Sequence, residues 1–175
     1  MKYYNFDSDY AIAKQSEDAV KAYYHNYYKQ TFPTTYLNCG FVRGVVKQRK
    51  FGDLQFLFND KDIHIEVKTD RALDKSSNNV IVEYWAHLPK DDLNHSARKK
   101  GWFQGYEKVD AIVFHPQYNS YAYLFPYPAF KQYILDNKDG FETFVLNNSK
   151  KRSAGWKVDI NELMNNVKGA KTITL

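Results

Sequence analysis

The stretch FGDLQFLFNDKDIHIEVKTD, residues 51–70, decides the fold, because a short turn separates two runs in which apolar and polar residues alternate. The simplest pairing uses Asn59 and Asp60 as a two-residue loop, since Asn tolerates the left-handed backbone that such loops require. Both alternations then agree on one register, which a slip by one residue would destroy. The stretch therefore predicts an antiparallel hairpin with strands at 52–58 and 62–69.

This hairpin sorts its side chains onto two faces of a sheet. The apolar face carries Leu54, Phe56, Ile63, Ile65 and Val67. The polar face carries Asp53, Gln55, His64, Glu66 and Lys68. The register sets Asp53 opposite Glu66, and a looser four-residue loop would set it opposite Lys68 on the same face. Two carboxylates at cross-strand distance repel each other unless a positive charge lies between them, so this face predicts a cation site.

The polar face suits one kind of chemistry. A Mg²⁺ ion is held by one or two carboxylates while it keeps several waters, and Mn²⁺ favours the same oxygen ligands and is expected to substitute for it. Such an ion acidifies a bound water and stabilises charge on a phosphoryl oxygen. The amine of Lys68 can orient or deprotonate the attacking water. Asp53, Glu66 and Lys68 together therefore predict metal-assisted hydrolysis of phosphodiesters.

The rest of the chain reads as an alternation of helices and strands. Residues 8–29 predict a helix, because apolar residues recur there at three- and four-residue steps. Further strands are predicted at 41–46, 80–86, 110–116, 121–126, 142–147 and 156–158, and further helices at 92–107, 128–137 and 159–167. This order predicts one α/β (α+β) domain over residues 1–175, built on a mixed β-sheet flanked by helices.

Composition restricts the class of protein. The chain has 175 residues, of which 43% are hydrophobic, and this is enough for a packed core. No apolar run is long enough to span a membrane, and the N-terminus lacks the apolar segment of a signal peptide. The single Cys39 cannot form an internal disulfide. We therefore expect an intracellular, cytoplasmic protein without membrane contact.

The charge of the chain favours a polyanionic partner. The formal net charge is +5 and the pI is near 9.0. Two basic clusters, KQRK and ARKKGWFQGY, supply the candidate nucleic-acid contacts Lys47, Arg49, Lys50, Arg98, Lys99 and Lys100. Basic side chains neutralise phosphates, and the aromatic residues of the second cluster can stack on bases. The alternative reading of either cluster is a solvated helix face with a hydrophobic underside.

Asp53 on one strand, followed after the hairpin by Glu66-Val67-Lys68, resembles the signature of the PD-(D/E)XK nucleases, the restriction-endonuclease-like superfamily. The resemblance covers about residues 8–125, implies an α-β-β-β-α-β core, and leaves 126–175 as a C-terminal extension. It implies that Asp53 and Glu66 bind Mg²⁺ and that the main-chain carbonyl of Val67 adds a ligand. It also implies that Lys68 acts on the nucleophilic water.

The resemblance extends to the first helix and to the strand after the hairpin. Many members carry an acidic residue on the first helix, where Glu17 is the candidate and Asp18 the less favoured neighbour. The stretch EVKTDRALDKSSNNVIVEYW is similar to small phage or mobile-element members and places Glu83 on a strand. Gln55 and Glu83 are auxiliary candidates. One departure is Gly52, which stands where the superfamily often has Pro.

His87, His95 and His115 show no metal-ligand spacing. We interpret His64, on the polar face, as a hydrogen-bonded surface histidine, although a contact to DNA or a general base is an alternative. His87, His95 and His115 are interpreted as structural or exposed. None of them enters the predicted metal site.

The sequence leaves three classes of function open. The first is a Mg²⁺-dependent DNA endonuclease, for which cleavage of both strands of a duplex would favour a homodimer. The second is a non-catalytic DNA- or RNA-binding module of the same fold, acting in replication, recombination or a phage or mobile-element process. The third is a sugar- or protein-binding α/β domain. The intact set of Asp53, Glu66 and Lys68 favours the enzyme, and the basic charge disfavours the third class.

Overall fold

The predicted hairpin lies at the centre of the fold. Strands β2 (Leu54–Phe58) and β3 (Lys61–Asp70) pair antiparallel, with Leu54 opposite Ile65. The turn residues Asn59 and Asp60 have φ angles of 49° and 58°. Two successive positive φ angles define the turn type whose twist matches that of the flanking strands. The register predicted from the two alternations is confirmed.

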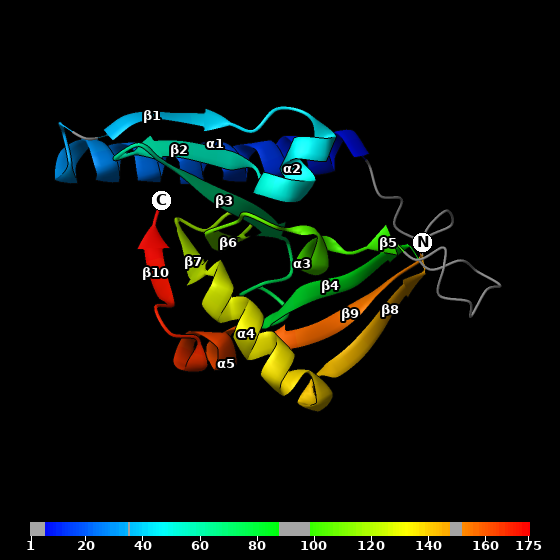
Figure 1. Ribbon diagram of the computed structural model, residues 1–175. Coiled ribbons are helices and arrows are strands. Elements are labelled where there is room, and N and C mark those ends of the chain that lie inside the picture. Colours follow the sequence, from blue (N-terminus) through cyan, green and yellow to red (C-terminus); the bar gives the residue numbers. More distant parts are fainter. Residues whose placement is uncertain (1–5, 35, 88–98, 148–151) are drawn as a thin grey trace.

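A computed structural model describes residues 6–34, 36–87, 99–147 and 152–175 (Figure 1). The remaining helices are α1 (Phe6–Thr31), α2 (Val45–Phe51), α3 (Trp102–Gly105), α4 (Tyr127–Asn137), a 3₁₀ helix (Lys138–Gly140) and α5 (Ile160–Asn166). The remaining strands are β1 (Tyr36–Phe41), β4 (Asn79–His87), β5 (Lys99–Lys100), β6 (Ala111–Pro116), β7 (Tyr121–Pro126), β8 (Glu142–Asn147), β9 (Arg152–Asp159) and β10 (Lys171–Thr174). No helix in these ranges is both long and apolar enough to cross a membrane.

The hairpin belongs to a mixed sheet, which we call the first sheet. Within the described residues its strand order is β1-β2-β3-β6-β7-β10, six strands in all. Only the β3–β6 pair is parallel among these neighbours, and the long connection between these two strands contains α3. Parallel neighbours require such a crossover. The predicted mixed sheet flanked by helices is therefore confirmed.

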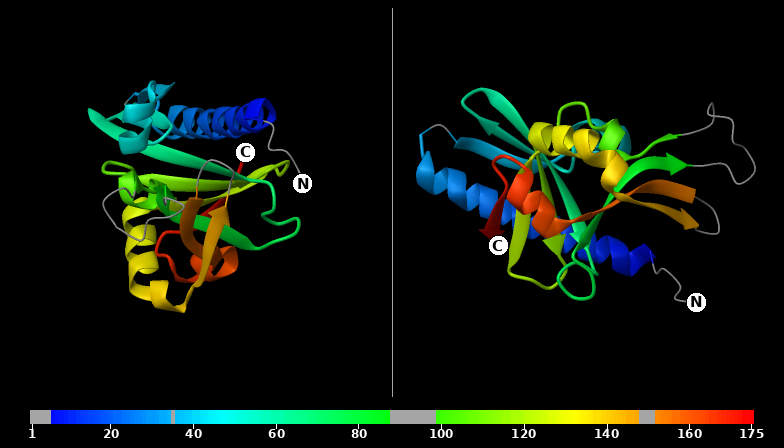
Figure 2. Two further views of the ribbon diagram at one scale, coloured as in Figure 1. Left: turned by 90° about the vertical axis from the view of Figure 1, so that its right-hand side faces the viewer. Right: turned by 90° about the horizontal axis from the view of Figure 1, so that it is seen from below.

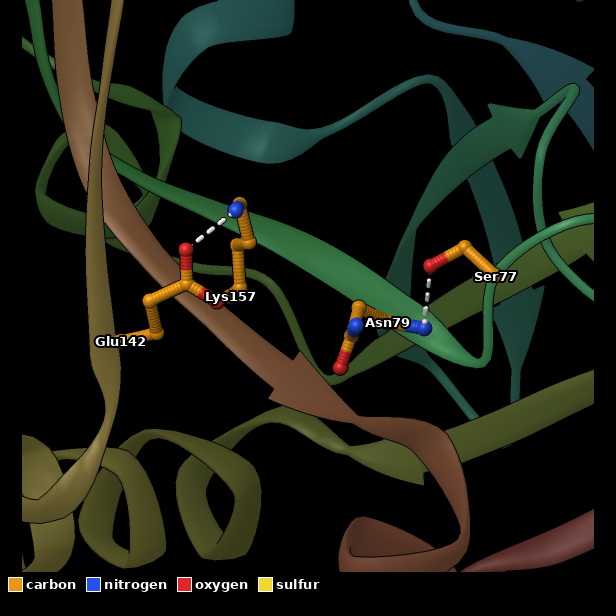
Figure 3. Close-up of polar contacts among 4 residues, drawn as sticks. All are labelled: Ser77, Asn79, Glu142 and Lys157. Atoms are coloured by element: carbon orange, nitrogen blue, oxygen red, sulfur yellow. Dashed lines mark hydrogen bonds and ion pairs between the residues drawn. The ribbon is translucent and has the colours of Figure 1, made fainter.

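A second sheet has the strand order β5-β4-β9-β8. Figure 3 shows two of its polar contacts: the ion pair between Glu142 of β8 and Lys157 of β9, and the 3.0 Å bond that the amide of Asn79 donates to Ser77 Oγ. At Gly155 on β9 a Cβ atom would lie 2.0 Å from the carbonyl oxygen of Val82, so only glycine lets β4 and β9 approach. The sequence predicted these strands without predicting a separate sheet.

The first sheet is covered on both faces (Figures 1 and 2). On one face, α1 packs through Val20 and Tyr24 against Leu54, Ile65 and neighbours. On the other face, α3, α4, α5 and the second sheet share a larger core that contains Phe103, Phe114, Phe125, Phe130 and Leu163. On the polar face of the hairpin, His64 and Glu66 of β3 are therefore buried, whereas Gln55 of β2 stays exposed.

Two sequence predictions need correction, and one strand was not predicted. The strand predicted at 41–46 is wrong, because β1 ends at Phe41 and residues 45–51 form α2; Gly44, with φ of 94°, turns the chain between them. The alternation there was too short to separate strand from helix. The helix predicted at 92–107 lies partly outside the described residues, and its described part forms β5 and α3. Strand β10, which pairs with β7, was missed.

Candidate active site

Asp53 stands at the entrance to the hairpin, between α2 and β2. The preceding Gly52 has φ of 78°, and a Cβ atom there would lie 2.8 Å from the carbonyl oxygen of Ile65. Proline fixes φ near −65°, so it could not adopt the positive φ angle of residue 52. This explains why Gly52 stands where PD-(D/E)XK nucleases often have proline. The amide of Asp53 donates to that same carbonyl at 2.9 Å, and Asp53 Oδ2 accepts a 2.9 Å bond from the amide of Val67. Backbone bonds therefore fix this carboxylate beside residues 66 and 67.

Glu66 and Lys68 form an ion pair on the enclosed face of β3. The carboxylate side chain is only 4% exposed, whereas that of Lys68 is 31% exposed. Burial raises the pKa of Glu66 to about 7; Lys68 opposes this shift and Asp53 adds to it. Burial also acts against the charge of Lys68, but Glu66, Tyr106 and Asp53 outweigh it and raise the pKa of the amine well above its usual value. Lys68 is therefore an ammonium group at neutral pH.

Two aromatic residues that the sequence pattern did not assign to the site hold this pair. The ring centroids of Trp102 and Tyr106 lie 5.3 and 5.7 Å from Lys68 Nζ, within cation–π range. The buried hydroxyl of Tyr106 also hydrogen-bonds to Glu66. Their spacing of four residues across α3 was the one signal in the sequence, because it places both rings on one side of a helical turn.

Glu17 completes the group from α1. Burial raises its pKa to about 7, Asp53 adds to the shift, and Lys14 opposes it. Its neighbour Asp18 is exposed and pairs with Lys14 at 2.8 Å. The structure therefore pairs Glu66 with Lys68 and fixes Asp53 beside them through the Val67 amide, and Glu17 of α1 is near enough for Asp53 and Lys68 to act on its pKa.

The donor set of this group fits Mg²⁺. In the described ranges no three His, Cys, Asp or Glu side chains are arranged as a ready metal cage. Mg²⁺ does not need one, because it is bound through one or two carboxylates and keeps several waters. The raised pKa values of Glu66 and Glu17 show that these carboxyl groups are desolvated and repelled by Asp53, and a divalent cation would relieve both effects. Asp53 and Glu66 are the carboxylates best placed to hold it.

The auxiliary candidates lie apart from this group. The exposed Gln55 donates a 2.8 Å bond to Asp62 Oδ1 on the neighbouring strand. Glu83 belongs to β4 of the second sheet, where its backbone lies against Gly101 and pairs with Gly155. Among the described residues, no hydrogen bond joins the side chain of Gln55 or Glu83 to Asp53 or Glu66.

The interpretation of His64 as a hydrogen-bonded surface residue is wrong. His64 is buried, its ring centroid lies 4.9 Å from that of Phe51, and burial lowers its pKa. Its Nδ1 has no hydrogen-bond partner among the described residues. Alternation within one strand does not show that both faces of a sheet are covered, so the sequence could not predict this burial. His115 is structural as predicted, with Nδ1 2.8 Å from Ser16 Oγ of α1; His95, and the side chain of His87, lie outside the described residues.

The two basic clusters of the sequence approach each other. Lys47 and Lys100 are exposed, and Lys50 pairs with Glu107 at 2.6 Å. The amides of Glu107 and Lys108 both donate to the Lys50 carbonyl at 3.2 Å, which docks the turn after α3 onto the end of α2. Arg98 and the side chains of Arg49 and Lys99 lie outside the described residues.

Two aromatic residues of the second basic cluster form the hydrophobic underside that was the alternative interpretation of this cluster. Phe103 and Tyr106 are buried, so they do not offer exposed faces to bases. Both belong to the core that lies under α3. Base stacking by these two rings is therefore excluded in this conformation.

Comparisons with known proteins return little. No protein-family model matches the sequence, and no curated protein matches it. Among solved structures, the chain is similar to a bacterial homing endonuclease, I-Ssp6803I, with a TM-score of 0.46 and 16% identity over 70% of this chain and 72% of that chain. At this level of similarity, function has to be inferred from the side chains of the site itself.

Proposed function

We propose that the protein is a Mg²⁺-dependent nuclease that hydrolyses phosphodiester bonds, acting as a DNA endonuclease. The observation that carries the proposal is the enclosed Glu66–Lys68 pair beside Asp53 and Glu17. Removing two charges from water costs free energy that their attraction often does not recover. A fold retains such a pair next to further carboxylates most readily when the charges serve a reaction.

The residues divide the reaction between them. Asp53, Glu66 and the carbonyl of Val67 would hold Mg²⁺, which when bound supplies an acidified water and stabilises charge on a phosphoryl oxygen. The ammonium of Lys68 would donate hydrogen bonds to the attacking water and to a phosphoryl oxygen. Tyr106 and Trp102 would keep that ammonium in place, and Glu17 would accept a hydrogen bond from the water. A new P–O bond to water forms as the ester P–O bond breaks, and the departing oxygen takes a proton.

The lysines around the end of α2 supply a surface for the substrate. Lys47, Lys50, Lys100 and Lys108 come from segments far apart in sequence, and Lys50, Lys100 and Lys108 all lower the pKa of Glu107. The convergence of Lys50, Lys100 and Lys108 around Glu107 gives a positive surface at the end of α2, the helix that leads to Asp53. Such a surface binds the phosphate backbone without reading its sequence.

A nicking assay on supercoiled plasmid, with Mg²⁺ or Mn²⁺ and with EDTA, tests the proposal. We expect the wild-type protein to nick or linearise the plasmid only with a metal ion, and we expect Lys68→Met and Asp53→Asn to abolish cleavage. The matched control is Lys157→Met, which removes the lysine of the Glu142–Lys157 ion pair in the second sheet. If the wild type cleaves neither with Mg²⁺ nor with Mn²⁺, the proposed nuclease activity is refuted. If both site variants still cleave, the assignment of Lys68 and Asp53 to the active site is refuted.

The second candidate is a non-catalytic nucleic-acid-binding module, which the converging lysines by themselves would support. It predicts that the wild type retards DNA or RNA in a gel shift and leaves the phosphodiester bonds intact with every metal ion. The same plasmid preparation therefore separates the two candidates.

A further inference from the structure

Two lysines of α1 meet over a single phenylalanine of β1. Lys14 Nζ lies 3.7 Å, and Lys21 Nζ 4.6 Å, from the ring centroid of Phe41. Seven residues make two helical turns, so the lysines project from the same side of α1. The negative face of an aromatic ring attracts a cation, but it does not cancel the repulsion between two of them. This arrangement leaves a concentrated positive charge on the α1 side of the molecule.

The negative charge around these lysines is small. Lys14 pairs with Asp18, and both side chains are exposed, by 40% and 56%. An exposed pair of this kind contributes little free energy and exchanges readily with solvent or ligand. No carboxylate in the described part of the chain lies within ion-pair distance of Lys21. An added anion would therefore be attracted to both ammonium groups.

The lysine pair lies next to the candidate active site. Phe41 pairs with Leu54, and the amide of the next residue, Val42, donates to the carbonyl of Asp53 at 2.8 Å. Lys14 is close enough to the site to act on the pKa of Glu17. The positive charge over Phe41 is therefore placed beside the carboxylates that the proposed function uses.

A second site of the same construction lies at the other end of the segment that leads to Asp53. Lys50 and Lys108 both lie 5.8 Å from the ring centroid of Phe51, and Lys50 is held by Glu107 as Lys14 is held by Asp18. The chain thus places one lysine pair over Phe41, at the end of β1, and another over Phe51, at the end of α2. The basic clusters of the sequence indicated candidate contacts only near the second pair.

We propose that Lys14 and Lys21, over Phe41, form a phosphate-binding site for the nucleic-acid backbone on the α1 side of Asp53. The strand would then cross the carboxylates with phosphates held by the Phe41 lysine pair before them and by the Phe51 lysine pair after them. This inference rests on the proposed function for its ligand class. It goes beyond that function because it assigns two residues that no motif or cluster in the sequence indicated.

Salt-dependent binding of a fluorescently labelled DNA duplex in EDTA tests the site without cleavage. Removing one lysine–phosphate contact should reduce the slope of log K against log salt by about 0.9. We expect Lys14→Met/Lys21→Met to lower the slope by roughly 1.8, measured between about 50 and 200 mM salt, and each single Lys→Gln variant to lower it by about half as much.

Lys171→Met is the matched control for the Phe41 lysine pair. Lys171 lies 5.9 Å from the ring centroid of Tyr27, so it is also a lysine over an aromatic ring beside α1. It belongs to β10, at the edge of the first sheet opposite β1. We expect this variant, which also removes a lysine charge from the protein, to keep the wild-type slope.

The outcomes separate this site from the proposed function. Equal slopes for the double variant and Lys171→Met, or no duplex binding by the wild type at about 50 mM salt, would overturn the site. A reduced slope for the double variant, together with a wild type that binds but never cleaves with Mg²⁺, would support the site and refute the nuclease. Far-ultraviolet circular dichroism of each variant shows that a changed slope does not come from unfolding.

Discussion

Both faces of β3 are buried over residues 64–67, and they differ in what they bury. Ile65 and Val67 contact α1 in an apolar core, whereas Glu66 and Lys68 lie against Trp102 and Tyr106 on the other face. Burial of the apolar row stabilises the fold by removing hydrocarbon from water. Burial of the charged row opposes folding unless pairing compensates for the lost hydration. One strand therefore supplies the packing of the first sheet with alternate residues and the candidate chemistry with the others.

The largest effect is expected when the charged pair of β3 is replaced. Such a variant should lose catalytic activity and keep its stability. In Glu66→Gln/Lys68→Met the buried ions are replaced by neutral side chains of similar size, so the free energy of unfolding should stay unchanged or rise by about 1–4 kcal/mol. Cleavage should fall by at least about 10²- to 10³-fold, since the variant no longer stabilises charge in the transition state. Urea unfolding and plasmid nicking measure the two. A loss of several kcal/mol would show that the pair holds the fold together.

The apolar face should give the opposite result. Ile65→Ala removes a fully buried side chain between α1 and the hairpin, which should lower the free energy of unfolding by about 2–5 kcal/mol. Cleavage per folded molecule should stay close to that of the wild type, because the Ile65 side chain packs in the apolar core and Ile65 holds Asp53 only through its backbone carbonyl, which the substitution keeps. Urea unfolding and nicking at a temperature where the variant is folded provide the measurement. A stable but inactive Ile65→Ala would contradict the division of labour between the faces.

The pH dependence of stability should come from the charged face. The folded-state pKa values of Glu66 and Glu17 are raised to about 7 from 4.5, so the folded protein binds more protons than the unfolded chain in this window. In EDTA, the free energy of unfolding should therefore fall as pH rises from about 4.5 to 7, by up to about 3 kcal/mol for Glu66. Mg²⁺ should stabilise the protein more at pH 8 than at pH 6, because it binds the deprotonated carboxylates.

Chemical denaturation at a series of pH values, with and without Mg²⁺, measures this effect. Glu66→Gln should flatten the pH profile, and the control Glu142→Gln should leave it unchanged, since Glu142 is exposed in the second sheet. A flat wild-type profile would show that these carboxyl groups are not destabilised by the fold.

The smallest effect is expected for the hydroxyl group of Tyr106, which bonds to Glu66 while its ring lies beside Lys68. Tyr106→Phe keeps the ring beside Lys68 and removes the hydrogen bond to Glu66, so stability should change by only about 1 kcal/mol. Loss of a residue that orients a metal ligand should raise the Mg²⁺ concentration needed for half-maximal cleavage by about ten-fold or more. A titration of cleavage against Mg²⁺ measures this, and an unchanged midpoint would show that Tyr106 only fills space.

The hairpin was predictable because its determinants lie within twenty residues. Two alternations and the Asn59-Asp60 turn agree on a single register, and that register places Asp53 beside Glu66. Glu17 was reached only through the resemblance to a nuclease family. The part of the site that depends on local sequence was therefore visible before the structure.

The rest of the site depends on contacts between distant segments. Trp102 and Tyr106 follow β4 and β5 of the second sheet in the chain, more than thirty residues beyond Lys68, and they lie beside Lys68 only in the folded structure. The pairing of β4 with β9 joins residues that lie far apart in sequence. The residue pattern of neither strand indicates which strand it pairs with. The same holds for His64, whose burial depends on Phe51 and the layers around it. Tertiary packing decides these features, and the pattern of residues within a single segment does not predict it.

Gly52 limits the mutational paths open to this protein. Any residue with a Cβ atom meets the Ile65 carbonyl there, and proline would need a φ angle of the opposite sign. A lineage could acquire a Pro-Asp pair at this position only by rebuilding the end of α2 at the same time. A sequence pattern that requires proline before the aspartate would not match this chain. It would also not match any descendant that keeps the present end of α2 and its glycine at position 52.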